Sequence, residues 1–166
     1  RRSLPSLTDA VLGYADGLTG IAILTRDDAI AYGVLGTIGR ASGLDRDLRR
    51  DDPYLAYAEL VGVFTVCGST DGDARARYRV LVDQLGGSSA IVDACVERLR
   101  ALADGPFDVS LPKVVRLPEG TTYTTIEGPI GVAGCLLVGA GDKFPWRMKI
   151  RSASFADRKS TRLNSS

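Results

Sequence analysis

Apolar side chains recur at helical spacing along three segments of the chain. The longest, residues 71–104, places apolar residues three and four positions apart, with Asp, Arg and Glu on the opposite side. The apolar stripe consists of Tyr78, Leu81, Leu85, Val92, Cys95, Leu99 and Leu102. It predicts one long helix or two in line, with a kink at residues 86–89, because two adjacent glycines weaken a helix interior. Shorter patterns predict helices over residues 4–16 and 26–34.

The spacing changes to two nearer the C-terminal end. Residues 122–127 are rich in β-forming side chains, and residues 132–138 form a buried-type apolar run. In a third run, Trp146, Met148 and Ile150 alternate with Arg147, Lys149 and Arg151. Glycine-containing turns separate the runs. This pattern predicts a small antiparallel meander over residues 122–152, with one apolar face and one basic edge.

Between these patterns, residues 35–52 are rich in glycine and charge and follow neither period. They predict a long ordered loop, which is uncommon in a compact domain unless it has a function or packs on something else. Together the patterns indicate an α+β fold, mainly helical, with a small antiparallel meander near the C-terminus.

Composition and charge exclude some classes of function. The 166 residues, 45% hydrophobic and 25% charged, fit one soluble domain. With 21 basic and 20 acidic residues the net charge is +1, so no nucleic acid partner is expected. The longest apolar run, residues 130–140, is interrupted by glycines and is shorter than the roughly 20 residues that a membrane helix requires.

Cysteine and histidine bear on the chemistry. The three cysteines are widely spaced, so neither a disulfide framework nor a CxxC metal site is indicated, and a reduced cytoplasmic setting fits them. The chain has no histidine, the commonest general base and metal ligand. No glycine-rich phosphate-binding motif is present. We therefore predict no catalytic residue and no metal site, and assign no cofactor-binding residue.

The polar residues that are the best candidates for a functional role lie in the predicted loop and in the meander. In one interpretation the loop is solvated and its charges pair among themselves, each exposed pair contributing at most about 1 kcal/mol. In the other, its arginines dock on a partner or face a polar cavity. The basic strand edge has the same two interpretations. The candidates for docking or cavity lining are Arg40, Asp45, Arg49, Glu127, Arg147 and Arg151.

A series of short motifs occurs in a fixed order. It includes Ala29-Ile30-Ala31-Tyr32-Gly33-Val34, Arg40-Ala41-Ser42-Gly43-Leu44-Asp45, Asp47-Leu48-Arg49-Arg50, Pro53-Tyr54, Asp71-Gly72-Asp73, Glu127-Gly128-Pro129 and Pro145-Trp146-Arg147. This series resembles the signature of the D-subunit family of respiratory complex I, the proton-pumping NADH:quinone oxidoreductase, and is similar to its actinobacterial branch. The resemblance covers about residues 6–157.

The resemblance implies the fold of the large subunit of nickel-iron hydrogenases. It also implies a peripheral position on the cytoplasmic side of the cell membrane, beside the subunit that carries the terminal iron-sulfur cluster. Quinone and NADH are then substrates of the complex, with FMN and iron-sulfur clusters on partner subunits. In the family, a histidine, a tyrosine and an aspartate that position the quinone precede this segment. We therefore expect residues 1–157 to be an internal to C-terminal part of the subunit, without bound cofactor and inactive alone.

Some positions depart from the family pattern. Ile130 and Val132 stand where much of the family has a basic residue and a glutamate, which suggests a changed partner contact or a divergent paralogue. Two other classes stay open: the large subunit of a membrane-bound energy-converting hydrogenase, which needs paired CxxC motifs, and a non-catalytic scaffold fragment. Residues 158–166 resemble nothing in the family and are predicted to be a non-native tail.

Overall fold

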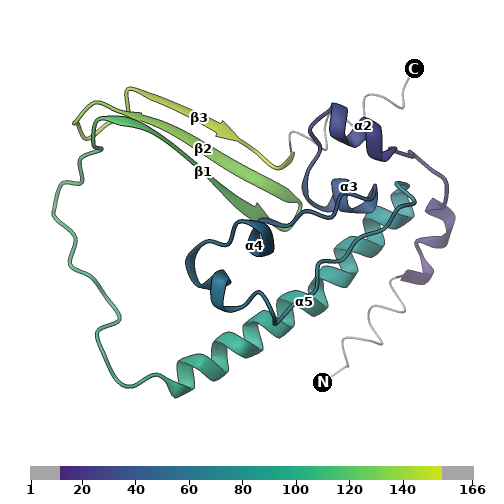
Figure 1. The fold of residues 1–166 in the computed structure, drawn as a ribbon, viewed down its shortest axis with the longest axis horizontal. Helices are drawn as coiled ribbons and strands as arrows, with labels where there is room; N and C mark the ends of the chain where they lie inside the picture. Colours follow the sequence, from purple (N-terminus) through teal and green to yellow (C-terminus); the bar gives the residue numbers. More distant parts are fainter. Residues whose placement is uncertain (1–11, 155–166) are drawn as a thin grey trace.

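Short helices join one end of a long helix to one end of a narrow sheet (Figure 1). The computed structural model describes residues 12–154. The elements are η1 (Asp16–Leu18), α2 (Arg26–Ala31), α3 (Gly36–Ala41), α4 (Leu48–Asp51), η2 (Leu55–Glu59), α5 (Ala74–Ala101), β1 (Gly120–Gly128), β2 (Gly131–Gly139) and β3 (Arg147–Arg151). Away from the short helices, α5 and the sheet diverge, and the segment between α5 and β1 connects their far ends. The structure combines helices with a three-stranded antiparallel sheet. The prediction of an α+β fold is thus confirmed.

The long helix α5 runs without a break through Gly86 and Gly87, so it is one helix and not two in line. It begins at a good N-cap, because the Asp73 carboxylate accepts the Ala76 N–H at 2.7 Å. Among the described residues, no helix is both long and apolar enough to cross a bilayer.

The face that α5 buries is not its predicted apolar stripe. The buried side chains are Ala76, Val80, Val82 and Ile91. By contrast Leu85, Val92 and Leu99 are 52%, 59% and 67% exposed. The reason is that α3 packs on α5 through small side chains, with Ala41 against Ala76 and Val80. Close approach of two helices favours such residues, so the large side chains of the stripe are left uncovered by the described part of the chain.

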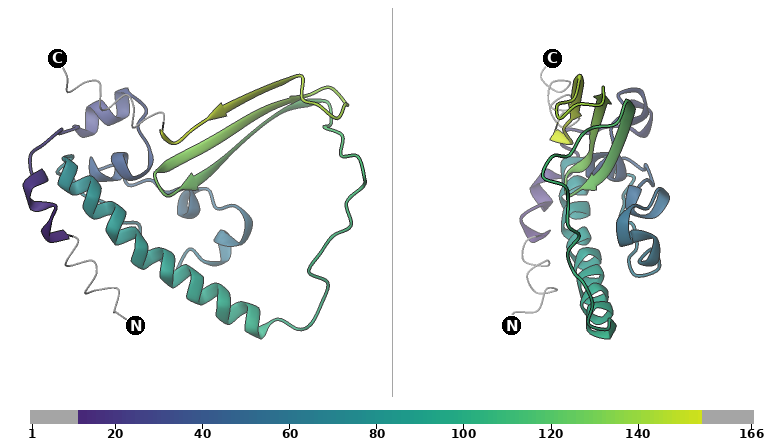
Figure 2. Two further views of the ribbon diagram at one scale, coloured as in Figure 1. Left: turned by 180° about the vertical axis from the view of Figure 1, so that it is seen from behind. Right: turned by 90° about the vertical axis from the view of Figure 1, so that its left-hand side faces the viewer.

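The meander predicted for residues 122–152 is confirmed. Its strand order is β1-β2-β3, with both pairs antiparallel. Gly128 faces Gly131 across a two-residue turn. The sheet extends from the short helices as a narrow arm (Figure 2). Every residue of β3 is exposed, so the predicted apolar face, with Met148 and Ile150, is not covered by the described residues.

The prediction of a long loop over residues 35–52 is wrong, because this segment contains helices α3 and α4. All six residues of α3 are buried. A Cβ atom at Gly36, where φ is +72°, would overlap the Cα of Gly131. The helix was missed because Ile38 is the one large apolar side chain in its packing surface and the other apolar positions there are glycine and alanine, which gives no apolar period. The start of α4 is marked by Asp47, whose carboxylate accepts the Arg49 N–H at 3.0 Å.

Two helices were predicted near the N-terminal end. The helix predicted over residues 26–34 is shorter, since α2 ends at Ala31 and Gly33 has a φ of +63°. Of the helix predicted over residues 4–16, residues 4–11 lie outside the described residues, residues 12 and 13 are helical, and 3-10 helix η1 begins at Asp16. The predicted tail of residues 158–166 also lies outside them.

Candidate functional site

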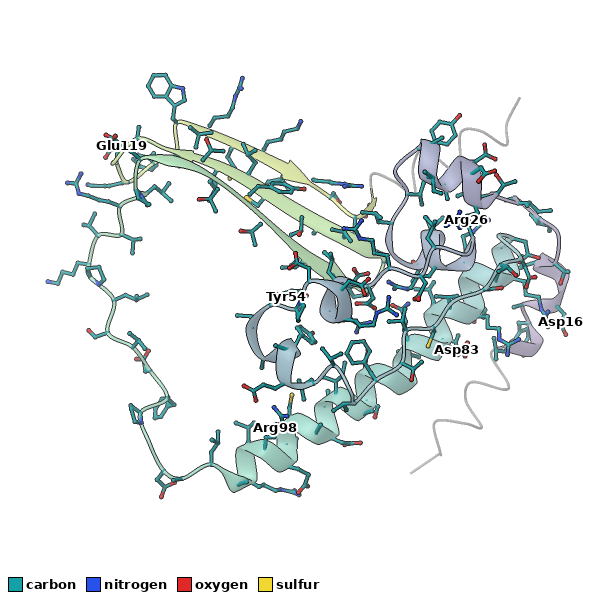
Figure 3. The ribbon with its side chains drawn as sticks, in the orientation of Figure 1. Asp16, Arg26, Tyr54, Asp83, Arg98 and Glu119 are labelled. Carbon is teal, nitrogen blue, oxygen red and sulfur yellow. The ribbon has the colours of Figure 1, made fainter. Side chains whose placement is uncertain are left out.

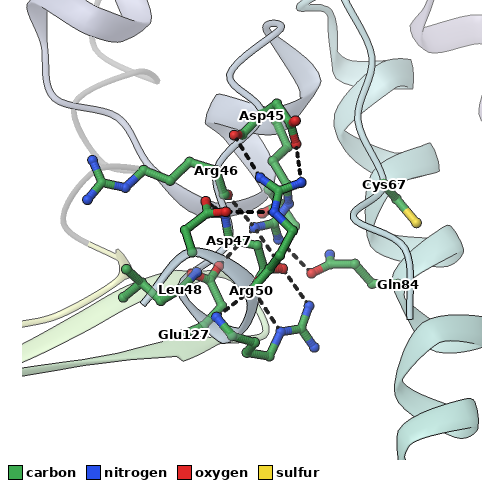
Figure 4. Close-up of polar contacts among 12 residues, drawn as sticks. Asp45, Arg46, Asp47, Leu48, Arg50, Cys67, Gln84 and Glu127 are labelled. Atoms are coloured by element: carbon green, nitrogen blue, oxygen red, sulfur yellow. Dashed lines mark hydrogen bonds and ion pairs between the residues drawn. The ribbon is translucent and has the colours of Figure 1, made fainter. Parts of the chain in front are cut away.

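Four charged side chains from three segments of the chain meet where α3, α4, α5 and β1 converge (Figure 4). Arg40 ends α3, Asp47 precedes α4, Arg49 lies in α4, and Glu127 lies near the end of β1. The side chains of Arg40 and Asp47 are each 1% exposed, and that of Glu127 is 3% exposed. We call these four residues the charged cluster.

Arg40 makes contacts to three other elements. Its Nη1 donates to Glu127 Oε1 at 2.9 Å and to the Arg46 carbonyl at 3.2 Å. Its Nη2 donates to Gln84 Oε1 of α5 at 2.7 Å. Asp47 Oδ2 lies 3.5 Å from Nη1. Within the described residues, the Nε of Arg40 has no hydrogen-bond partner. One guanidinium therefore joins α3 to α5, to β1 and to the segment before α4.

Arg49 and Asp47 form a two-point contact. Nε and Nη2 of Arg49 donate to Oδ1 and Oδ2 of Asp47 at 2.9 and 2.7 Å. The Arg49 guanidinium also lies 4.9 Å from the centre of the Phe64 ring. Burial alone would raise the pKa of Asp47, but the hydrogen bonds and charge of Arg49 outweigh it and hold that pKa below its usual value. The same hydrogen bond raises the pKa of Arg49.

Glu127 is held through its side chain and its main chain. Oε2 accepts the Leu48 N–H at 3.3 Å, at the start of α4. The Glu127 N–H donates to Tyr54 Oη at 3.1 Å, and that hydroxyl donates to the Glu127 carbonyl at 3.4 Å. Tyr54 lies on the segment that joins α4 to η2 (Figure 3), and burial raises its pKa. These bonds fix the end of β1 against α4.

The structure brings three of the six predicted residues together, namely Arg40, Arg49 and Glu127. The other three lie elsewhere. Asp45 accepts from Arg50 Nη1 at 2.9 Å and is 75% exposed. Arg147 lies on the exposed strand β3, opposite Val138. Arg151 Nη2 donates to the Gly33 carbonyl at 3.1 Å. Whether any of the six contacts a partner stays a prediction.

Asp47 belongs to the charged loop predicted from the sequence but was not chosen as a candidate, and Gln84 and Tyr54 were not predicted as members of this site. Asp47 had a local signal, because an aspartate before a helical turn is a common N-cap. Gln84 and Tyr54 had none, since their partners are 44 and 73 residues away in the sequence.

The chemistry of the charged cluster is that of paired, mutually satisfied charges. Two guanidinium groups face two carboxylates, so their formal charges cancel. Among the described residues there is no group of three or more His, Cys, Asp or Glu side chains that could hold a metal ion. The arrangement can fix the relative positions of four elements.

The fold matches a chain of a respiratory membrane complex. It resembles a chain in the solved structure of the membrane-bound sulfane sulfur reductase (MBS), an archaeal respiratory membrane complex, with a TM-score of 0.74 and 28% identity. The match covers 92% of this chain and 44% of that one. The sequence profile described as "Respiratory-chain NADH dehydrogenase, 49 Kd subunit" matches residues 13–115 and 107–163. The chain belongs to this family.

Curated relatives agree with this assignment. The chain is 45% identical to an NADH-quinone oxidoreductase D subunit of Streptomyces coelicolor, over 93% of this chain and 41% of the relative. It is 50% identical to a D subunit of Streptomyces griseus, over 81% and 34%, and 45% identical to a D subunit of Salinispora tropica, over 95% and 40%. The resemblance to the D-subunit family and its actinobacterial branch is thus confirmed. The chain spans 34–41% of the length of these relatives.

Proposed function

We propose that this chain is part of the quinone-reducing subunit of a proton-translocating NADH:quinone oxidoreductase. In this complex electrons pass from NADH through iron-sulfur clusters to quinone. The observation that carries the proposal is the identity of 45–50% with relatives named as NADH-quinone oxidoreductase D subunits, over more than four fifths of this chain.

Within the whole protein, residues 12–154 have a positioning role. The charged cluster holds α3, α4, α5 and β1 in fixed relative positions and forms part of a rigid wall. The chain is inactive alone and binds no cofactor. FMN and the iron-sulfur clusters belong to partner subunits of the peripheral arm, on the cytoplasmic side of the membrane. Among the candidate docking residues, exposed Asp45 and Arg147 are the ones best placed to contact a partner.

The finer fold assignment belongs to the same proposal. The chain is a mainly helical part of a fold like that of the nickel-iron hydrogenase large subunit. The resemblance to the sulfane sulfur reductase chain supports a wider relationship among respiratory membrane complexes. The identity to that chain is 28%, against 45–50% for the three NADH-quinone oxidoreductase relatives, which favours the quinone-reducing function. An energy-converting hydrogenase and a non-catalytic scaffold are the alternatives.

The proposal is tested by isolating the tagged protein, in its full length, from membranes of the cells that produce it. The expected result is a multisubunit complex that contains flavin and iron-sulfur clusters and reduces a soluble quinone with NADH. A matched preparation from untagged cells is the control. A complex that evolves hydrogen or reduces sulfane sulfur, and does not oxidise NADH, would contradict the assignment.

A further inference from the structure

A cavity of about 420 Å³ lies beside the charged cluster, between η2, α5 and the turn that joins β1 to β2. Leu81 and Leu85 of α5 and Pro129 of the turn provide apolar wall. Its polar lining includes Arg49, Tyr57, Gln84 and Ser88. The cavity is therefore amphipathic, and residues of α4, η2, α5 and the β1–β2 turn form it.

Several polar groups of this lining have no hydrogen-bond partner in the part of the chain that the structure describes. Arg49 uses Nε and Nη2 to bind Asp47, and no hydrogen bond or ion pair within residues 12–154 involves its Nη1. The hydroxyls of Tyr57 and Ser88 are likewise unengaged by the described chain, as is the amide nitrogen of Gln84, whose oxygen accepts from Arg40. A guanidinium and an amide nitrogen only donate, whereas a hydroxyl can donate or accept. The lining thus offers both donors and acceptors.

The charge around the cavity limits what can bind. The two positive charges of the charged cluster are cancelled by the carboxylates of Asp47 and Glu127. An ionised ligand would lose its hydration without finding a net opposite charge, which is costly. A neutral group that makes hydrogen bonds has a much smaller desolvation cost and satisfies donors that are already desolvated in part.

We propose that this cavity binds a neutral amide carried on a small apolar body. The amide oxygen accepts from Arg49 Nη1 and the Tyr57 hydroxyl, and the amide N–H donates to the Ser88 hydroxyl. The apolar body packs on Leu81 and Leu85. The amide is supplied by an adjoining polypeptide, because Leu81 and Leu85 belong to the apolar stripe that the described residues leave exposed, and this chain spans only 34–41% of the length of its relatives. This inference does not depend on the proposed function.

The test is titration of the full ¹⁵N-labelled chain with N-butylacetamide, followed by two-dimensional NMR. Saturable shifts are expected at the lining residues, and pentanoate, which carries the same butyl chain but a negative charge, is expected to produce much weaker ones. Tyr57→Phe removes one neutral hydrogen bond and should weaken binding about 2- to 10-fold. Leu85→Ala should weaken it similarly, because it removes apolar contact. Arg100→Lys, at an exposed position of α5, is the matched control and should bind like the unaltered chain.

Absence of saturable shifts at the lining residues would overturn the proposal, as would equal binding of pentanoate. Unchanged affinity in both Tyr57→Phe and Leu85→Ala would also overturn it, provided that each variant keeps the circular dichroism spectrum of the unaltered chain. Repeating the titration on the full-length protein in its assembled complex tests the source of the amide. Loss of binding is expected there, because the adjoining polypeptide already occupies the cavity, and retained binding would overturn the assignment to a polypeptide amide.

Discussion

At the scale of single residues, Arg40 and Glu127 hold the described structure together. Both are almost fully buried, and each binds a group from another element. Their charges were visible in the sequence, and both were predicted as site residues. Their burial was not predictable, because it depends on a contact between positions 87 residues apart.

Replacing Glu127 by alanine should destabilise the protein strongly. The change leaves the Arg40 guanidinium buried beside one carboxylate only and removes the acceptor of the Leu48 N–H. Loss of one partner of a buried ion pair costs about 3–5 kcal/mol. The free energy of unfolding in urea measures the effect. Glu97→Ala, which removes an exposed ion pair with Arg100, should change that free energy by less than about 1 kcal/mol, and equal effects of both variants would contradict the prediction.

Asp73 makes stability depend on pH. Hydrogen bonds from the main-chain N–H groups of Gly20 and Ala76 lower the pKa of Asp73 from its usual 3.8. A lowered pKa in the folded state means that the stabilisation is complete above the unfolded value and is lost as pH falls through the folded value. In Asp73→Asn the ionised group is absent, so the variant should be less stable than the unaltered protein near neutral pH.

The difference in unfolding free energy between Asp73→Asn and the unaltered protein should shrink below about pH 4, where the aspartate of the unaltered protein is progressively protonated. Urea unfolding at a series of pH values measures it, and Asp93→Asn, exposed on α5, is the control. A difference that stays constant down to about pH 2 would contradict the assignment of this pH dependence to Asp73.

At the scale of elements, the sequence predicted those with a regular pattern and missed those without one. The long helix and the meander have periods of 3.6 and 2 and were found. Helix α3 was missed because it packs through Gly36, Gly39 and Ala41 and through Ile38, its one large apolar residue, so no apolar period is visible. The apolar stripe on α5 was predicted to be its buried face, but it is exposed. The buried face is the one where α3 packs, and close packing of α3 favours the small side chains there.

Gly36→Ala should destabilise the contact between α3 and the β1–β2 turn. The new Cβ would overlap the Cα of Gly131, and the residue has a φ of +72° that non-glycine residues rarely adopt. We expect a loss of more than about 1 kcal/mol in unfolding free energy, from the backbone conformation alone. Equal stability of the variant and the unaltered protein, in thermal or urea unfolding, would show that this contact is not close.

Gly86→Ala should have the opposite effect and increase the stability of the protein. Gly86 lies inside α5, no atom lies within 4 Å of the position that a Cβ would occupy, and its φ is not positive. Alanine in a helix interior is favoured over glycine by about 0.5–1 kcal/mol. Thermal unfolding should therefore show a raised midpoint, and a lowered midpoint would indicate that this position is covered.

At the scale of the whole molecule, the apolar stripe of α5 and one face of the sheet stay exposed among the described residues. Contiguous exposed apolar surface is typical of surfaces that other polypeptide covers. The relatives are more than twice as long as the matched segment. We therefore expect these faces to be buried in the assembled complex, while the charged cluster sets the angle between α5 and the sheet.

The most direct test of this account is Arg40→Ala in the full-length protein, with Arg100→Ala as an exposed control. The amount of assembled complex in membranes is measured together with its NADH-dependent quinone reduction. The account predicts that Arg40→Ala lowers both in proportion, because losing a partner of a buried ion pair costs about 3–5 kcal/mol, while activity per assembled complex is retained. Control levels of both assembly and quinone reduction in Arg40→Ala would contradict it.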